Sequence, residues 1–207
     1  MARLISKLKQ NPFIVNQVSQ TEKDDISCKV FCEANSNGRS LPNILITGTP
    51  GTGKTTLCEL VSSGDYNHIN VSEEIKRNKW YSSYDEEMDS LIFSDYKVRK
   101  GLSKMISSGG NLIDFHSVAN IIPSSLIDLV VVLSTNNTVL YDRLANRKYS
   151  PQKIRENIEC EIMQVLLEEA HEAFKETPHI PILNLTSDCE ADQNSNAERL
   201  RRVLKID

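Results

Sequence analysis

Short apolar runs alternate with longer amphipathic stretches from Pro42 onward. Several of the runs are apolar on both faces, as expected for strands that helices cover on either side. Five such runs predict strands at residues 43–47, 68–71, 111–115, 129–133 and 181–185. Helical periodicity predicts helices at residues 54–62, 73–80, 95–107, 137–146, 151–175 and 197–204. The alternation therefore predicts an α/β fold with a five-stranded parallel sheet and a helical layer on each face.

The longest predicted helix, residues 151–175, carries its own start signal. Ser150 is a favourable N-cap, and Pro151 suits the first helical position. Apolar residues form one stripe along it: Ile154, Ile158, Ile162, Val165 and Leu166. The acids at positions 159, 161, 168 and 169 are interpreted as its solvated face.

Residues 1–40 lack sustained periodicity. The polar stretch "ANSNGRS" at 34–40 is typical of a linker. We therefore expect a flexible N-terminal extension over 1–40, followed by one domain over 41–207. Arg3, Lys7 and Lys9 form a weak organelle-targeting pattern, but serine is sparse and Pro12 interrupts any helix, so a flexible cytosolic or nuclear tail is the alternative.

Composition narrows the functional classes. The longest apolar stretch, 129–133, is far short of the roughly 20 residues that span a membrane, so we expect no membrane partner. The net charge of −4 argues against broad nucleic-acid binding, and we expect no direct sequence-specific contact with nucleic acid. The five cysteines lack a Cys-x-x-Cys pair and are interpreted as free thiols in a reducing compartment, with Cys28 and Cys32 alone a poor zinc site.

A phosphate-binding motif follows the first predicted strand. "GTPGTGKT" at 48–55 fits G-x-x-x-x-G-K-[ST] and leads into a predicted helix. Its glycines let backbone N–H groups point at phosphates, assisted by the positive end of the helix dipole. Lys54 is expected to reach the outer phosphates, and the hydroxyl of Thr55 to bind Mg²⁺. A chance match is the alternative.

An acid at the end of a buried strand completes this apparatus. Asp114 in "NLIDFH" is expected to hold Mg²⁺, directly or through water. The alternative is an ordinary aspartate at the end of a strand that caps a turn. The Asn-Lys-x-Asp motif of guanine-binding proteins does not occur. We therefore expect the bound nucleotide to be ATP.

Two further segments are placed to bind a phosphate acceptor. Residues 70–93 offer cations and aromatic side chains that either stack a base or form a local core: Lys76, Arg77, Lys79, Trp80, Tyr81 and Tyr84. A second group of cations gathers at a junction of two predicted helices: Arg143, Arg147, Lys148, Lys153 and Arg155. This group predicts a cationic lid over the transferring phosphates, with an exposed basic helix face as the alternative.

The chain resembles the adenylate kinase isoenzyme 6 family of small nucleotide kinases, which is also linked to small ribosomal subunit maturation. The resemblance covers residues 42 to about 175. It rests on "PNILITGTPGTGKTTL", "INV" followed by "YDEE" at 84–87, "IDFH" at 113–116, "VLYDRLANRKY" at 139–149 and "NIECEIMQVLLEEA" at 157–170. Ordinary adenylate kinases have glycine-phenylalanine-proline-arginine where this chain has Asp114-x-His116.

The resemblance implies a P-loop NTPase three-layer sandwich similar to nucleoside monophosphate kinases. It implies that residues 70–93 bind the monophosphate, through Lys76, Arg77 or Tyr84, and that residues 146–156 form the lid. Arg147 matches a lid arginine that contacts ATP, and Arg143 matches an arginine over adenine. The residues that would hold ATP are Gly51, Gly53, Lys54, Thr55 and Thr56. The chain departs from the family pattern after "NV", where it has Ser72, Glu73 and Lys76, with Arg77 one place late.

The resulting expectation is a kinase that uses ATP and Mg²⁺ to phosphorylate AMP or a related monophosphate. A monophosphate is already anionic near neutral pH, with a second pKa of about 6, so transfer needs alignment and cations more than a base. The resemblance adds ATPase activity, a role in 18S rRNA maturation with a small-subunit ribosomal protein or pre-ribosome, and a location in nucleus and cytoplasm. The preferred monophosphate and the oligomeric state stay open.

Two alternative functions stay open. One is an ATP-hydrolysing ribosome assembly factor with little kinase activity. The other is a kinase for a small alcohol, which would need a base such as His116 or the cluster at Asp85. His116, with an ordinary pKa near 6.5, is expected to share a strand face with Asp114 and to orient water for hydrolysis. The acids Asp85, Glu86, Glu87 and Asp89 are a candidate docking site for a basic ribosomal tail, or simply solvated charge.

Overall fold

A five-stranded parallel sheet forms the centre of the molecule. The computed structural model describes residues 20–85, 90–118 and 121–206. The strands occur in the spatial order β2 (Asn67–Asn70), β5 (Asn111–Asp114), β1 (Asn43–Gly48), β6 (Leu129–Ser134) and β7 (Ile182–Thr186), and each adjacent pair is parallel. All five strands expected from the sequence are present, which confirms the α/β prediction.

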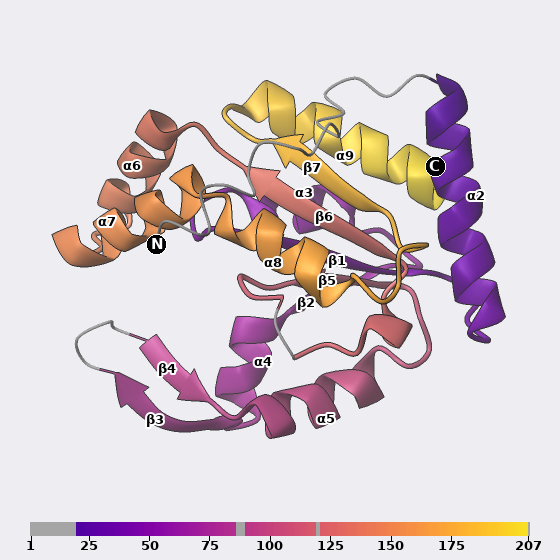
Figure 1. Ribbon diagram of the computed structural model, residues 1–207, viewed down its shortest axis with the longest axis horizontal. Helices are drawn as coiled ribbons and strands as arrows, with labels where there is room; N and C mark the ends of the chain where they lie inside the picture. The colour runs from indigo at the N-terminus through magenta and orange to yellow at the C-terminus, as the bar shows by residue number, and fades with distance from the viewer. Residues whose placement is uncertain (1–19, 86–89, 119–120, 207) are drawn as a thin grey trace.

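Helices cover both faces of the sheet (Figure 1), so that its three central strands, β5, β1 and β6, are buried on two sides. Ile44 and Ile46 of β1 pack with α3 (Lys54–Val61), α9 (Glu190–Leu204) and α2 (Gln20–Ser36). Leu45, between them, packs on the opposite face with α5 (Asp95–Met105) and α8 (Val165–Ala173). This alternation along β1 produces the three-layer sandwich that the apolar runs predicted.

Two structures project beyond the carboxyl ends of the strands, on the same side of the molecule (Figure 1). One is helix α4 (Val71–Arg77) followed by an antiparallel hairpin of β3 (Tyr81–Asp85) and β4 (Ser90–Phe93). The other is the pair α6 (Asn137–Asn146) and α7 (Pro151–Ile162). The expected helix at 73–80 is thus displaced towards the N-terminus, and the hairpin was not anticipated. A short 3₁₀ helix at Ser124–Leu126 precedes β6.

The expectation of one continuous helix over 151–175 is wrong. Helix α7 ends at Ile162, and Gln164 adopts a left-handed conformation with φ of 51° before α8 begins at Val165. The apolar stripe is continuous through the break, which is why periodicity alone did not reveal it. The break separates two packing roles: α7 lies against α6, and α8 packs on the sheet.

The expectation of a flexible extension up to residue 40 is also wrong for its described part. Helix α2 packs against α9, its Val30 and Ala34 are fully buried, and Ser27 Oγ donates to Val203 O at 2.9 Å. The packed domain therefore begins before residue 41. Arg3, Lys7 and Lys9, and the acids Glu86, Glu87 and Asp89 with the side chain of Asp85, lie outside the described residues.

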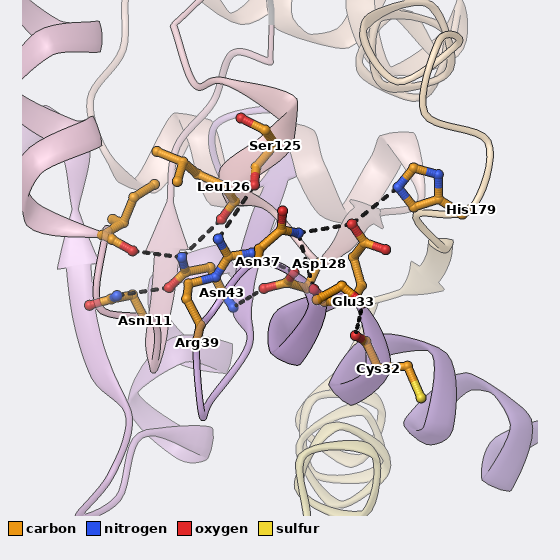
Figure 2. A network of polar contacts seen from close by, with 12 residues as sticks. Cys32, Glu33, Asn37, Arg39, Asn43, Asn111, Ser125, Leu126, Asp128 and His179 are labelled. Atoms are coloured by element: carbon orange, nitrogen blue, oxygen red, sulfur yellow. Dashed lines mark hydrogen bonds and ion pairs between the residues drawn. The ribbon is translucent and has the colours of Figure 1, made fainter.

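A buried polar network replaces the expected linker at 34–40 (Figure 2). Arg39 forms an ion pair of 2.7 Å with Asp128, and Asp128 Oδ2 accepts from the backbone N–H of Asn43 at 2.8 Å. The side chain of Asn43 donates to Ile106 O and accepts from Asn111 Nδ2, both at 2.8 Å. The network joins the amino ends of β1, β5 and β6. It therefore fixes the three strands whose opposite ends carry the site.

Among the helices that the structure describes, none is long and apolar enough to cross a membrane.

Candidate active site

The loop between β1 and α3 is shaped by packing from distant helices. Gly51 and Gly53 have φ of 98° and 95°, in the region that favours glycine. A Cβ on Gly51 would lie 2.8 Å from Leu140 Cδ1 of α6, and one on Gly53 would collide with the side chain of Gln193 of α9. The loop can therefore curl tightly in front of α3. Its backbone N–H groups and the helix terminus together form an anion site.

Lys54 is a buried cation at the centre of this loop. Its Nζ donates to Gly48 O at 2.8 Å and to Thr49 O at 3.1 Å. Burial lowers the pKa of Lys54 to about 8, against the opposing influence of Asp114. The ammonium is therefore still charged at neutral pH but poorly solvated. Such a cation interacts strongly with phosphate oxygens.

Thr55 and Asp114 form the oxygen-rich part of the site. Thr55 Oγ1 donates to Asp114 Oδ2 at 2.6 Å, and only 4% of Asp114 is exposed. Burial raises the pKa of Asp114, but contacts from His68 and Thr55 and the charge of Lys54 outweigh it and hold the pKa below its ordinary value. A hydroxyl beside an ionised carboxylate is the hard-oxygen pair that Mg²⁺ prefers, so these residues fit the ion.

A cleft of about 640 Å³ opens from this pair towards the hairpin. It brings together most of the residues that the sequence singled out, from six different elements and loops. They are Lys54, Thr55, Asp114, His116, Lys76, Tyr84 and Arg147. The volume lies within the range of small-molecule sites.

The cation beside the acceptor region is Lys76 rather than Arg77. Lys76 lines the cleft, whereas Arg77 does not, and Arg77 forms an ion pair of 2.6 Å with Glu74 on its own helix. The aromatic residues divide as well. Tyr84 lines the cleft, while Trp80 and Tyr81 pack against the core, as the local-core reading proposed.

His116 lies at the cleft wall but not on the strand with Asp114. Strand β5 ends at Asp114, and the ring of His116 lies against that of Phe115, with centroids 4.5 Å apart. Burial of the ring, then the charge of Lys54, lowers the pKa of His116 to about 4, although the residue as a whole is exposed to solvent at the cleft wall. The imidazole is therefore neutral near pH 7. This pKa lies below the ordinary value of 6.5 on which the predicted role of His116 in hydrolysis was based, and that role stays a prediction.

A second cavity, of about 420 Å³, lies on the other side of the loop. It is lined by Gly51, Gly53, Thr56, Arg143 and Arg147, and also by Gln193 and Asn194 of α9. Arg143 is held in place because its guanidinium donates to Ser187 O and Asp188 O, each at 2.9 Å. The contribution of 187–194 was missed, since no motif in that segment signals a ligand.

Arg147 lines both cavities. It is the C-cap of α6 and is followed by Lys148 with φ of 59°, so the chain turns sharply there. Ser150 then caps α7, and Lys153 places its Nζ 4.6 Å from the ring centroid of Tyr149 at the cleft wall. The region 146–156 is thus a compact turn and the first turns of α7.

Glu161 links α7 to the phosphate loop and was misread as part of a solvated face. Its carboxylate accepts from Thr49 Oγ1 at 2.5 Å and from the backbone N–H of Thr135 at 2.7 Å. Glu159 and Glu168, by contrast, are exposed as expected. Periodicity placed Glu161 correctly on the helix. It could not show that the helix would turn this position towards the loop.

The fold and the site define the chain as a P-loop kinase. It resembles the shikimate kinase from Acinetobacter baumannii solved with shikimate, at TM-score 0.55 and 18% identity, over 82% of this chain and 97% of that one. That likeness concerns the fold. A family model described as "AAA domain" matches residues 44–164.

Relatives in sequence give the family. The chain is 42% identical to an adenylate kinase isoenzyme 6 homolog of Schizosaccharomyces pombe, over 78% of this chain and 91% of the relative. It is 40% identical to the homolog of Dictyostelium discoideum, over 75% and 90%. The chain belongs to the adenylate kinase isoenzyme 6 family. The resemblance stated from the motifs is thereby confirmed.

Proposed function

We propose that this protein transfers the terminal phosphate of ATP to AMP or a related nucleoside monophosphate, with Mg²⁺ as cofactor. The observation that carries the proposal is the pair of cavities on either side of one phosphate loop, both lined by Arg147. The smaller cavity, with Arg143 and Thr56, would hold the ATP base. The larger one would hold the monophosphate.

The charges around the larger cavity suit an anionic acceptor. Lys54 and Arg147 lie on its loop and lid sides, and Lys76 on its far side. Two phosphates brought together repel each other, and cations placed around both lower that cost in the transition state. Thr55 and Asp114 would hold Mg²⁺, which neutralises charge on the outer phosphates of ATP. No strong base is needed, because the acceptor oxygen is already ionised near neutral pH.

ATP hydrolysis is the second activity that we propose. His116 lines the same cleft as Lys54, and its neutral imidazole can accept a hydrogen bond from water. If hydrolysis dominated and transfer were absent, the protein would instead be an ATP-driven assembly factor. Transfer to a small alcohol has less support, since His116 is a weak base at a pKa of about 4.

A role in small ribosomal subunit maturation, in the nucleus and cytoplasm, is the broader part of the proposal. It rests on the family resemblance of "YDEE" and "IDFH" and of the motifs around them. A capture experiment tests the acidic cluster. It compares how the wild type and a variant bind a basic small-subunit ribosomal protein, and the variant carries reversed charges at residues 85, 86, 87 and 89. Equal and salt-insensitive capture by both forms would exclude the cluster as the docking site.

A transfer assay tests the kinase proposal. ADP production from ATP is followed with a panel of AMP, dAMP and CMP, and with ATP alone as the blank. We expect at least one monophosphate to raise ADP production well above the blank. If none does, the ATPase alternative leads.

Lys76 and Arg77 provide a matched pair for the acceptor side. Both are exposed cations on α4, but only Lys76 lines the cleft. Lys76→Ala should raise the KM for the monophosphate by about 10-fold or more, as expected for a lost charge-assisted contact. Arg77→Ala should leave this KM unchanged. Equal effects of the two substitutions would contradict the placement of the monophosphate beside Lys76.

A further inference from the structure

Asp114 also lies close to two side chains of types that bind metal ions, and neither is Thr55. Cys58 of α3, His68 of β2 and Asp114 of β5 each offer one ligand atom, and these three atoms all lie within 4.8 Å of one another. Cys58 is fully buried in the core between α3 and the sheet. The Mg²⁺ function of Asp114 and Thr55 uses neither the thiol nor the imidazole.

His68 is the observation that points to a ligand. Its Nε2 is buried and finds no partner with good hydrogen-bond geometry among the described residues, and its contact with Asp114 Oδ2 is a long one of 3.5 Å. A buried polar nitrogen that makes only such a long contact is poorly satisfied. A cation between the imidazole and the carboxylate would satisfy the nitrogen.

The donor set has the chemistry of zinc. Zn²⁺ binds one sulfur, one nitrogen and one carboxylate oxygen at about 2.0–2.3 Å, which places tetrahedral ligand atoms roughly 3.3–3.8 Å apart. The separation of 3.5 Å between His68 Nε2 and Asp114 Oδ2 already fits. The sulfur needs a shift of about 1 Å at most to complete three ligands, with water as the fourth. Mg²⁺, which avoids sulfur, would not use this set.

We propose that Cys58, His68 and Asp114 form a binding site for Zn²⁺, and that zinc bound there withdraws Asp114 from Thr55 and from Mg²⁺. Binding replaces the S–H bond of Cys58 with a sulfur–zinc bond and releases the proton to solvent, while His68 contributes the lone pair of one ring nitrogen. One carboxylate then belongs to two competing metal sites. Zinc acts as an inhibitor of the phosphate-transfer site, and this part of the inference rests on the proposed function.

Cobalt reports the sulfur ligand without any need for activity. The exposed pair Cys28 and Cys32, with sulfurs 3.7 Å apart, is a competing thiol site, so the test uses the full chain with Cys28→Ser and Cys32→Ser as the parent. Adding Co²⁺ to this parent should give the charge-transfer absorption of a cobalt–thiolate bond. Adding Cys58→Ala should abolish it, and His68→Gln should weaken cobalt binding about 10-fold or more.

Inhibition is measured on the same proteins. With Mg²⁺ and ATP constant, Zn²⁺ should inhibit ATP turnover of the parent, and Cys58→Ala should raise the half-inhibiting zinc concentration at least about 10-fold. Melting curves verify that each variant is folded. A cobalt–thiolate band that survives Cys58→Ala would overturn the site, and so would its absence from the folded parent. A band that requires Cys58, with identical zinc inhibition in both proteins, would overturn the competition for Asp114. A parent with the band but no ATP turnover would contradict the proposed function and leave the zinc site standing.

Discussion

At the scale of the residue, the burial of Lys54 in the phosphate loop carries a cost to stability. Its folded pKa of about 8 lies below the ordinary value of 10.5, so the charged form is disfavoured by folding. That cost is fully present below pH 8 and disappears as the pH rises towards 10.5, where the unfolded chain also loses the proton. Lys54→Met should therefore raise the free energy of unfolding at pH 7 by about 3 kcal/mol at most. The gain should be smaller than this limit, because the substitution also removes the hydrogen bonds to Gly48 and Thr49.

The same substitution should lower ATP turnover by about 100-fold or more, because the outer phosphates lose a desolvated cation. Urea unfolding at several pH values and the transfer assay check both effects. The stability gain should shrink between pH 8 and 10.5. A variant that is less stable than the wild type at pH 7, or that keeps its turnover, would contradict this account of Lys54.

Arg147 is the second prediction at this scale. It lines both cavities, whereas Arg155 on α7 is exposed and lines neither. Arg147→Ala should lower kcat/KM for ATP about 10- to 100-fold, the cost of one charge-assisted contact. Arg155→Ala serves as the control and should stay near wild type. If the two variants behave alike, general positive charge and not the position of Arg147 supports activity.

The motif residues could be predicted because their chemistry is local. The loop 48–55 needs glycines, a lysine and a hydroxyl in fixed order, and the structure has them at the start of α3. Gln193 and Glu161 could not be predicted this way. Each contacts the loop across more than 100 residues of sequence, and neither belongs to a motif with a chemical signature.

At the scale of the element, Glu161 fixes α7 to the phosphate loop and to the end of β6. Glu161→Gln should weaken at least one of its two hydrogen bonds and lower the free energy of unfolding by about 1–2 kcal/mol. The KM for ATP should rise, because Thr49 loses its anchor. Glu159→Gln, on the exposed side of the same helix, is the matched control. Denaturant unfolding and steady-state kinetics measure the pair, and an unchanged Glu161→Gln protein would show that the link is dispensable.

The errors in the predicted elements have physical causes. The helix over 151–175 broke because a single left-handed residue, Gln164, interrupts it without changing the apolar stripe. The hairpin of β3 and β4 was missed because its two strands are short and their residues match neither a clear strand nor a clear helix pattern. Tyr81 at its start, and Trp80 just before it, pack against the core. Tertiary packing decided both.

At the scale of the whole molecule, the segment before Leu41 is part of the folded domain. Arg39 and Asp128 are both almost fully buried, and burial raises the pKa of Asp128 despite its hydrogen bonds from Asn43 and Arg39. Arg39→Ala leaves that carboxylate unpaired, so we expect a loss of about 3–5 kcal/mol at pH 7.

The raised pKa of Asp128 also predicts how the effect of Arg39→Ala on stability changes with pH. A raised folded pKa means that stability falls as the pH rises through it, so the loss caused by Arg39→Ala should be largest at neutral pH and smaller at acidic pH, where Asp128 takes up a proton. The double variant with Asp128→Asn should recover part of the loss. Urea unfolding of the full chain at neutral and at acidic pH measures this. No loss in Arg39→Ala would restore the view of 34–40 as a linker.

The fold as a whole followed from the apolar runs, because a strand buried on two faces is apolar throughout. The start of the domain did not. Helix α2 has a weakly amphipathic sequence, and its buried contacts with α9 join residues far apart in the sequence, such as Ser27 and Val203, which are 176 positions apart.

The destination of the γ-phosphate of ATP tests the central claim most directly. The protein is given γ-labelled ATP, Mg²⁺ and AMP, or the monophosphate that the panel favours, and the labelled products are separated. We predict label in the β-position of the new diphosphate, in excess over labelled inorganic phosphate, and loss of this product in Lys54→Met. Label in inorganic phosphate alone, at a rate that no monophosphate changes, would contradict the kinase assignment.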